Sequence, residues 1–137
     1  SSLGAGVAVY VSGIDDRVAA VILENGLGNG ERIIRGMHTP ESWNGSLMQF
    51  TAETAVSFFT FRSEEMMARI SPRPVLILHS ARDRVCNYDE AFSLARMAEP
   101  PFELHLLDGA DHFMFVDANP QVAFTLRNWL DRYFPVG

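Results

Sequence analysis

The sequence contains a single cysteine, Cys86, and it has neither a long apolar run nor a cluster of basic residues. One cysteine excludes an internal disulfide bond and a zinc site built from several cysteines, so we interpret Cys86 as a small, semi-buried apolar side chain. No apolar run approaches the roughly 20 residues that a membrane-spanning helix needs, and the first residues lack the charged-then-apolar order of a signal peptide. We therefore expect no membrane contact and a cytoplasmic location.

Other ligand sites also lack their sequence patterns. The formal net charge of −6, with no run of lysine or arginine, provides no electrostatic attraction to nucleic acid. The four histidines do not show a metal-binding spacing such as His-x-x-x-His, so no metal site is expected. The glycines between Asn25 and Gly30 are not followed by the lysine-serine or lysine-threonine pair of a phosphate-binding loop. We interpret them as a turn, and we expect no cofactor.

Apolar runs and helical patterns alternate along the chain. The 137 residues, 47% of them hydrophobic, are sufficient for one domain with an apolar core. Buried strands are predicted over Val18–Leu23, Val75–His79 and Phe102–Leu107. Helices are predicted over Leu3–Gly13, which Gly13 would end, over Tyr88–Ala98, with Asn87 as cap, and from Asn119-Pro120 onward. This alternation predicts an α/β fold with a parallel sheet of about three strands.

Residues 31–71 form a different kind of segment, in which short helical patterns carry many aromatic and sulfur-containing side chains. Thr39-Pro40-Glu41 and Ser63-Glu64-Glu65 are typical of helix starts. We interpret the segment as a helical cap inserted into a single, incomplete domain that spans residues 1–137. The aromatic side chains are expected first of all in the core of this cap, because burying them is an ordinary source of stability.

Two loops that follow strands carry candidate reactive groups. Open parallel sheets place such groups just beyond the carboxyl ends of their strands. Asp83 follows the strand that begins at Val75, and His112 follows the strand that ends at Leu107, so the two side chains can meet if these strands are neighbours. Asp108 is a rival for the role of the acid, as is Asp111, but neither follows the strongest strand.

The other histidines have simpler interpretations. His79 ends a predicted strand and His105 lies inside one, so both are interpreted as structural. His38 lies in the predicted cap, where it is a weaker candidate for lining a pocket.

Ser2 is the candidate nucleophile. The stretch Ser2-Leu3-Gly4 matches the second half of a Gly-x-Ser-x-Gly elbow, in which a strand turns sharply into a helix and exposes the serine oxygen. In that geometry the amide of Leu3 points at the developing oxyanion. The opening glycine of the motif is not in the sequence. The order Ser2, Asp83, His112 reproduces the order of nucleophile, acid and base in one class of hydrolases.

Ser2–Gly6, Arg73–Val85 and Leu106–Phe113 are spread over nearly the whole chain. Together they resemble the carboxyl-terminal half of an α/β-hydrolase, and in particular the dienelactone-hydrolase and prolyl-oligopeptidase-like esterases and peptidases. Ser80 departs from the family pattern, which usually has glycine there, and this predicts a slightly strained turn before Asp83. The resemblance implies a larger sheet in which the three predicted strands are adjacent, in chain order, at one edge.

The resemblance also implies a Ser-His-Asp triad and an acyl-enzyme intermediate. Ser2 would attack an acyl carbonyl, His112 would take the serine proton and return it to the leaving group, and Asp83 would orient and stabilise the imidazole. Leu3 would supply one oxyanion donor, whereas the loop that normally supplies the second is not in the sequence. Because the family's cap overhangs the site, candidate walls for an apolar acyl or alcohol group are Trp43, Phe58 and Phe59.

We therefore expect a serine hydrolase that cleaves a carboxylic ester, with a small peptide or amide as the alternative substrate. A hypothesis from another class is a non-catalytic half that needs its missing amino-terminal half or a partner chain. A third hypothesis takes Ser1 as an N-terminal nucleophile activated by its own amine. The resemblance further predicts that Val18–Leu23 exposes an apolar, unpaired strand edge, which favours aggregation or pairing with another chain, homo-oligomers included.

Overall fold

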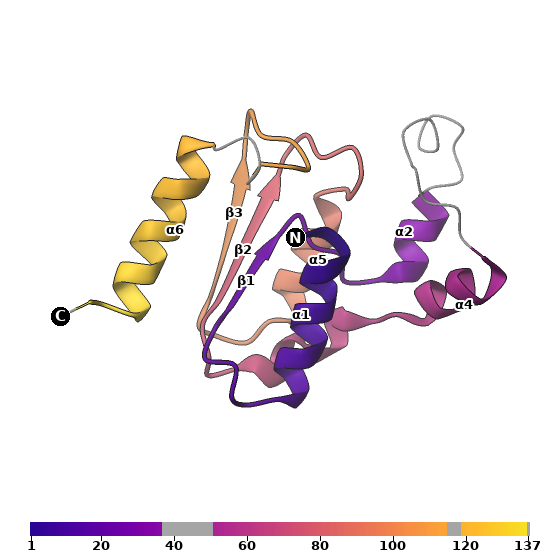
Figure 1. Cartoon of the computed structure of the whole chain (residues 1–137), viewed down its shortest axis with the longest axis horizontal. Coiled ribbons are helices and arrows are strands. Elements are labelled where there is room, and N and C mark those ends of the chain that lie inside the picture. Colours follow the sequence, from indigo (N-terminus) through magenta and orange to yellow (C-terminus); the bar gives the residue numbers. More distant parts are fainter. Residues whose placement is uncertain (37–50, 115–118, 137) are drawn as a thin grey trace.

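The centre of the molecule is a parallel sheet of three strands in the order β1-β2-β3 (Figure 1). The computed structural model describes residues 1–36, 51–114 and 119–136. The strands are β1 (Val21–Glu24), β2 (Val75–Ser80) and β3 (Phe102–Leu107). Val75 pairs with Val21 on one side and with Phe102 on the other, so the strands start in line and their carboxyl ends share one edge of the sheet. The predicted parallel sheet and its strand order are confirmed.

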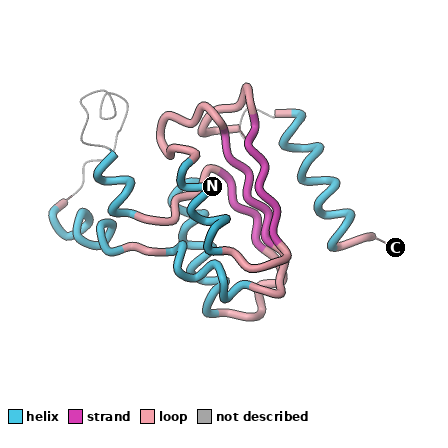
Figure 2. The backbone as a smooth tube through the Cα atoms, turned by 180° about the vertical axis from the view of Figure 1, so that it is seen from behind, coloured by secondary structure: helices cyan, strands magenta, loops and turns pink. Residues whose placement is uncertain are grey.

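Helices cover both faces of the sheet (Figures 1 and 2). One face packs against α1 (Ser2–Ile14), α5 (Asp89–Met97) and the 3-10 helix η1 (Ser63–Ile70), and the other packs against α6 (Pro120–Tyr133). The side chains of β2 alternate between these layers, as strand geometry requires. Ile77 lies in the core with α1 and α5, whereas Leu78 lies in the core with Trp129 of α6. All six residues of β2 are buried, which marks it as the central strand.

The chain between β1 and β2 is helical where the structure describes it. It forms α2 (Gly30–Gly36) and α4 (Ala52–Thr60) and then η1. Figure 1 shows α2 and α4 beside each other, away from the sheet. They share a small apolar cluster that includes Leu27, Ile33, Phe58 and Cys86. The predicted helix start at Thr39-Pro40 lies outside the described residues.

Two boundaries differ from the sequence prediction at the amino-terminal end of the sheet. The first strand begins at Val21 and not at Val18, because the Arg73 guanidinium binds the carbonyls before it: Nη1 donates to Asp15 O at 2.9 Å and to Val18 O at 3.1 Å. The first helix ends at Ile14, so Gly13 is not its last residue. A Cβ on Gly13 would lie 2.8 Å from the Cβ of Met66 in η1, so this glycine permits close helix packing.

A smaller difference concerns α5. The helix begins at Asp89, one residue after the predicted start. Asn87 still contributes to the start of the helix, because its Oδ1 accepts a hydrogen bond from the Asp89 amide at 3.0 Å.

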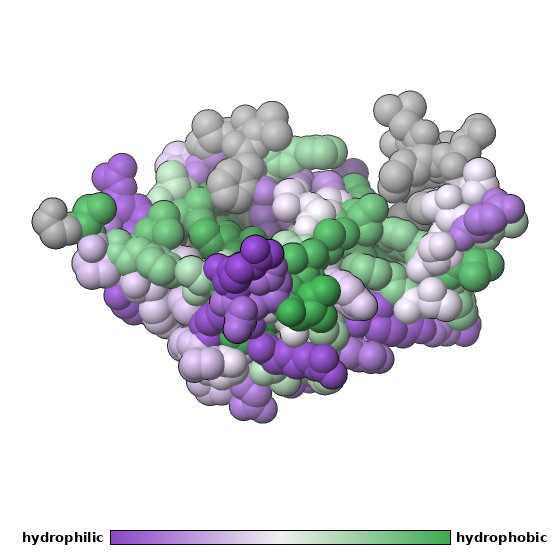
Figure 3. All heavy atoms as spheres, turned by 60° about the horizontal axis from the view of Figure 1, so that its bottom comes forward, coloured by the Kyte–Doolittle hydropathy of each residue, from purple (hydrophilic) through white to green (hydrophobic). Residues whose placement is uncertain are grey.

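In the part of the chain that the structure describes, no helix is both long and apolar enough to cross a membrane. The surface near the amino-terminal ends of the strands mixes apolar and charged residues (Figure 3).

Candidate active site

Asp83 lies in the turn after β2, and its carboxylate is completely buried. Oδ1 accepts hydrogen bonds from the amides of Val85 at 2.7 Å and Cys86 at 2.9 Å. These bonds hold the side chain against its own loop, a local turn that aspartate readily forms. The second oxygen, Oδ2, accepts from Nδ1 of His112 at 2.7 Å. One carboxylate oxygen is thereby held by the turn, and the other binds the imidazole of His112.

His112 lies in the turn after β3 and reaches Asp83 because β2 and β3 are paired neighbours. Its ring is 7% exposed and packs edge-on against Phe113, with 5.2 Å between the ring centroids. A carboxylate accepts hydrogen bonds only, so the His112 proton in this pair belongs on Nδ1. The lone pair of a neutral imidazole is then on Nε2, where a general base needs it. The predicted meeting of the two side chains is thus observed.

An open cavity of about 680 Å³ lies beside His112. Among the described residues, its walls include Arg82 and Arg84 from the loop after β2, and Phe113 and Met114 from the loop after β3. Arg82 pairs with Asp108 at 3.0 Å in an exposed ion pair. Asp108 therefore faces solvent and Arg82, and it does not contact His112.

Ser2 begins α1 with a φ of 51°, in the left-handed region that non-glycine residues seldom adopt. The first hydrogen bond of the helix runs from Ala5 N to Ser1 O at 3.1 Å. The Leu3 amide comes earlier in this first turn and has no carbonyl of the helix to bind. Figure 1 shows this end of α1 close to the carboxyl end of β1. A left-handed serine at a helix start agrees with the predicted nucleophile elbow in this one respect. The elbow itself stays a prediction.

Ser2 contacts the turn that carries Asp83 through Cys86. Burial raises the pKa of the Cys86 thiol to about 12, and the hydrogen bond with the Ser2 side chain opposes this shift. Because the amide of Cys86 also binds Asp83, Ser2 lies two contacts away from the carboxylate. Within the described residues, no hydrogen bond joins Ser2 to His112. Asp83 and His112 are therefore paired, whereas Ser2 lies next to the loop of Asp83 and, among the described residues, is not hydrogen-bonded to the imidazole.

His79 lies beneath Asp83 at the end of β2 and is fully buried. Its Nε2 donates to Cys86 O at 2.9 Å and is 3.8 Å from Asp83 Oδ2. Among the described residues, Nδ1 has no partner. Burial lowers the pKa of His79, and the bond to the Cys86 carbonyl and the charge of Asp83 oppose that effect only in part. The His79 side chain therefore favours the neutral form, and its hydrogen bond to Cys86 O supports the turn that carries Asp83.

Asn25 and Ser80 lie behind the Asp83–His112 pair, and sequence reasoning did not select either as a site residue. Ser80 N donates to Asn25 Oδ1 at 2.7 Å, and Ser80 Oγ donates to Ala110 O at 2.6 Å. The predicted strain at Ser80 is wrong, because among the described non-glycine residues only Ser2 and Asn25 have a positive φ. The serine hydroxyl instead joins the two loops. An asparagine directly after a strand is the sequence signal that could have pointed here, since it tolerates this backbone conformation.

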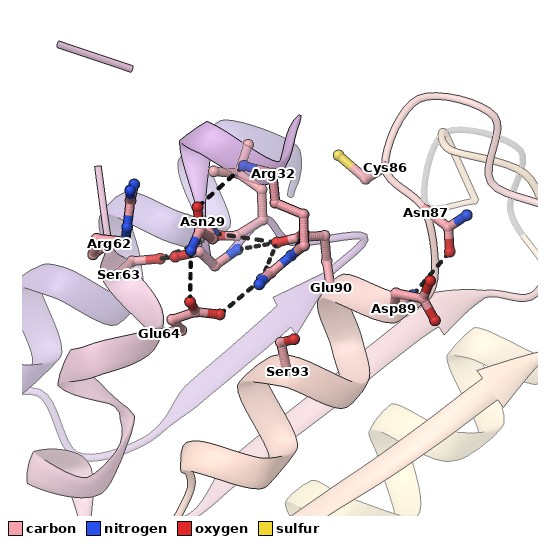
Figure 4. A network of polar contacts seen from close by, with 12 residues as sticks. Asn29, Arg32, Arg62, Ser63, Glu64, Cys86, Asn87, Asp89, Glu90 and Ser93 are labelled. Carbon is pink, nitrogen blue, oxygen red and sulfur yellow. Dashed lines mark hydrogen bonds and ion pairs between the residues drawn. The ribbon is translucent and has the colours of Figure 1, made fainter. Parts of the chain in front are cut away.

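A buried polar network fixes the loop that follows Asn25 (Figure 4). Glu90 of α5 is 2% exposed, and its Oε2 accepts from Gly28 N at 2.8 Å and from Asn29 N at 3.2 Å. Arg32 of α2 bridges Glu90 and Glu64, with 2.7 Å between Arg32 Nη2 and Glu64 Oε2. Burial alone would raise the pKa of Glu64, but the hydrogen bonds from Arg32 and Asn29 outweigh it and lower that pKa.

The predicted cap walls have different environments. Trp43 lies outside the described residues. Phe58 is buried in the cluster with Leu27 and Cys86, whereas Phe59 is 40% exposed, with its ring centroid 6.0 Å from the Arg35 guanidinium carbon. Neither phenylalanine is among the residues that line the cavity beside His112. Within the described ranges, no cluster of three or more histidine, cysteine or acidic side chains could hold a metal ion.

No protein-family model and no curated protein matches the sequence. Solved structures match the fold. The esterase domain of a Rhodothermus marinus protein has a TM-score of 0.71 and 22% identity, over 96% of this chain and 58% of that one. An α/β-hydrolase from Penicillium sp. sh18 has a TM-score of 0.70 and 17% identity, over 96% of this chain and 61% of that one. An acetyl xylan esterase from Paenibacillus sp. R4 has a TM-score of 0.72 and 17% identity, over 97% of this chain and 43% of that one.

These matches are distant in sequence and extensive in structure. The chain spans between 43% and 61% of the length of these three structures. Its three parallel strands and their flanking helices are therefore part of a larger fold in each of them. The resemblance that the motifs predicted is confirmed at the level of structure: the chain has the fold of part of an α/β-hydrolase domain.

Proposed function

We propose that this chain supplies the Ser-His-Asp triad of a serine hydrolase that cleaves carboxylic esters. The observation that carries the proposal is the buried hydrogen bond of 2.7 Å between Asp83 and His112, which leaves Nε2 as the basic nitrogen. Ser2 supports it, because its positive φ and helix-start position suit an exposed nucleophile. Two of the matched structures are an esterase domain and an acetyl xylan esterase, which favours an ester over an amide.

In the proposed mechanism Ser2, His112 and Asp83 each have a separate role. Ser2 Oγ bonds to the acyl carbon while His112 Nε2 takes its proton, and Asp83 stabilises the resulting imidazolium. The imidazolium then gives the proton to the departing alkoxide as the ester C–O bond breaks. A water molecule repeats these steps on the acyl-enzyme and releases the acid. The Leu3 amide donates to the oxyanion.

The same proposal places the activity in a longer protein. The resemblance puts the second oxyanion donor on a loop after an earlier strand that is not in this sequence, and removing one such donor lowers the rate on the order of 100- to 1000-fold. The Ser2–His112 hydrogen bond is also not formed within the described residues. Both features fit a nucleophile whose position is completed by strands outside this chain.

Fluorophosphonate labelling of the intact protein tests the nucleophile. Wild-type protein should be labelled at Ser2, and Ser2→Ala should lose the label together with hydrolysis of p-nitrophenyl butyrate, by on the order of 10,000-fold or more. Ser1→Ala is the matched control, because it changes the adjacent serine and should retain both activities. Labelling that survives Ser2→Ala removes Ser2 as nucleophile. The alternative with Ser1 requires a free amine on that residue, so it is tested separately on the 137-residue chain, where blocking the amine should abolish any activity of this kind.

A further inference from the structure

Asn25 connects the carboxyl ends of all three strands. It directly follows β1, is completely buried and has a φ of 43°. Its backbone amide donates to Leu78 O of β2 at 2.9 Å, which extends the β1–β2 pairing by one residue. The left-handed backbone turns the chain away from the sheet at this point. Asparagine accepts this conformation more readily than most residues.

The side-chain amide of Asn25 uses both its donors and its acceptor. Nδ2 donates to Asp111 O and to His112 O, both at 3.0 Å. Oδ1 accepts from Ser80 N at 2.7 Å. One side chain therefore binds the turn that carries the base and the strand end that leads into the acid. An aspartate of the same shape would place negative charge against two carbonyl oxygens.

Ser80 completes the same connection from the other side. Its hydroxyl donates to Ala110 O at 2.6 Å and accepts from Arg82 N at 3.1 Å. Three consecutive carbonyls, those of Ala110, Asp111 and His112, are thus held by two buried side chains. The backbone of the His112 turn cannot shift without breaking at least one of these bonds.

We propose that Asn25 is the positioning residue for His112, fixing the backbone on both sides of the Asp83–His112 hydrogen bond. This proposal rests on the proposed hydrolase function only in its kinetic consequence. A proton-transfer group displaced by about 1 Å can lose on the order of 100-fold in rate. Asn25 is completely buried and does not line the cavity beside His112, so its substitution should lower kcat and leave KM nearly unchanged.

The test compares three variants of the intact protein. Asn25→Asp keeps the shape and removes the donors, whereas Asn25→Gly keeps the backbone conformation and removes the whole amide. Asn29→Ala is the matched control, because Asn29 lies in the same loop and its side chain binds Glu64 and the Arg32 amide and not the His112 turn. The first measurement is the low-field proton NMR signal of His112 Nδ1, assigned by its absence in Asp83→Asn.

The wild-type protein and Asn29→Ala should show this signal, and both Asn25 variants should lose or broaden it. The rate of fluorophosphonate labelling should fall about 100-fold in the Asn25 variants and by less than about threefold in Asn29→Ala. If Asn25→Asp does not fold, as judged by circular dichroism, Asn25→Gly decides the question. Folded Asn25 variants that keep the signal and label within twofold of wild type would overturn the proposal.

The two proposals fail in different ways. If the wild-type protein is never labelled, the hydrolase function fails, but the NMR signal still reports whether Asn25 holds the His112 ring on Asp83. If the wild-type protein is labelled and the Asn25 variants behave like Asn29→Ala, the function stands and the positioning role fails.

Discussion

His79 shows how one buried side chain can couple stability to pH. Its ring is fully enclosed, and burial lowers its pKa below the ordinary 6.5. The groups that act on it are the Cys86 carbonyl, the acidic side chains of Asp83 and Glu90, and the imidazole of His112. Burial disfavours the protonated ring in the folded state, whereas the unfolded chain leaves the imidazole free to take up a proton.

We predict that stability falls as the pH drops below about 6.5. Above this pH the ring is neutral in both states, and below it the unfolded chain binds a proton that the folded protein excludes, until the lowered folded pKa is reached. In this range His79 lowers the free energy of unfolding by up to about 1.4 kcal/mol per pH unit. Urea unfolding at pH 7.5, 6.5 and 5.5 measures this free energy, and His79→Gln should make it depend less on pH. Parallel curves for the two proteins would contradict the assignment.

At the scale of single residues, the sequence pattern predicted the contact between Asp83 and His112 but not the side chains that support it. Asp83 and His112 could be predicted because each directly follows an apolar strand, and neighbouring strands bring the two loops together. Asn25 could not, because its role depends on carbonyls far along the chain, at Asp111 and His112. The role of Ser2 as the nucleophile stays a prediction.

At the scale of elements, one charged cluster joins α2, η1 and α5, in addition to the apolar contact of η1 with α5. Glu90, Glu64 and Arg32 come from three different helices and meet next to Asn29 (Figure 4). Glu90 also binds the amides of Gly28 and Asn29. Breaking a buried ion pair by removing one partner is destabilising, because the remaining charge is left without compensation.

We therefore expect Glu90→Gln to lower the free energy of unfolding by about 2 kcal/mol, less than a fully enclosed pair because Arg32 is 38% exposed and keeps Glu64. Glu31→Gln is the matched control: it removes ion pairs with Arg35 and Arg62 at the surface and should cost less than about 1 kcal/mol. Guanidinium unfolding measures both. An equal effect of the two substitutions would show that the buried network adds no more stability than the ion pairs of Glu31.

Elements were predicted best where a local pattern was sufficient. The apolar run at Val75 identified β2, and the Asn119-Pro120 pair identified the start of α6. The start of β1 was missed because the carbonyls before it bind Arg73, which is distant in sequence. Gly13 was taken for a helix end because its actual neighbour, Met66, cannot be inferred from the residues next to it.

At the scale of the whole molecule, one helix and one strand edge lack a covering layer within the described residues. The outer face of α1 exposes Leu3, Val7, Tyr10, Val11 and Ile14. Next to it, β1 pairs with β2 alone, and Ile22 is 37% exposed. Apolar surface beside an open strand edge favours association. The strand edge that the resemblance predicted is therefore present, whereas its partner stays a prediction.

We predict that the 137-residue chain, expressed alone, associates with itself at tens of micromolar. The double variant Val7→Lys and Val11→Lys should shift sedimentation toward the monomer, because it places two charges on the outer face of α1. Val56→Lys on α4 is the control, since this valine is 65% exposed but lies away from the sheet, and it should associate like wild type. A wild-type chain that sediments as a monomer would contradict the prediction.

The Asn25-Gly26 sequence also makes the proposed positioning residue sensitive to deamidation whenever the protein unfolds. An asparagine followed by glycine deamidates when the glycine amide nitrogen can attack the side-chain carbonyl. In the folded protein that side chain is buried and held by three hydrogen bonds. Each unfolding event frees it, and deamidation then yields aspartate or isoaspartate in place of Asn25. Ageing or heating would thus produce the Asn25→Asp change chemically, and refolding could not reverse it.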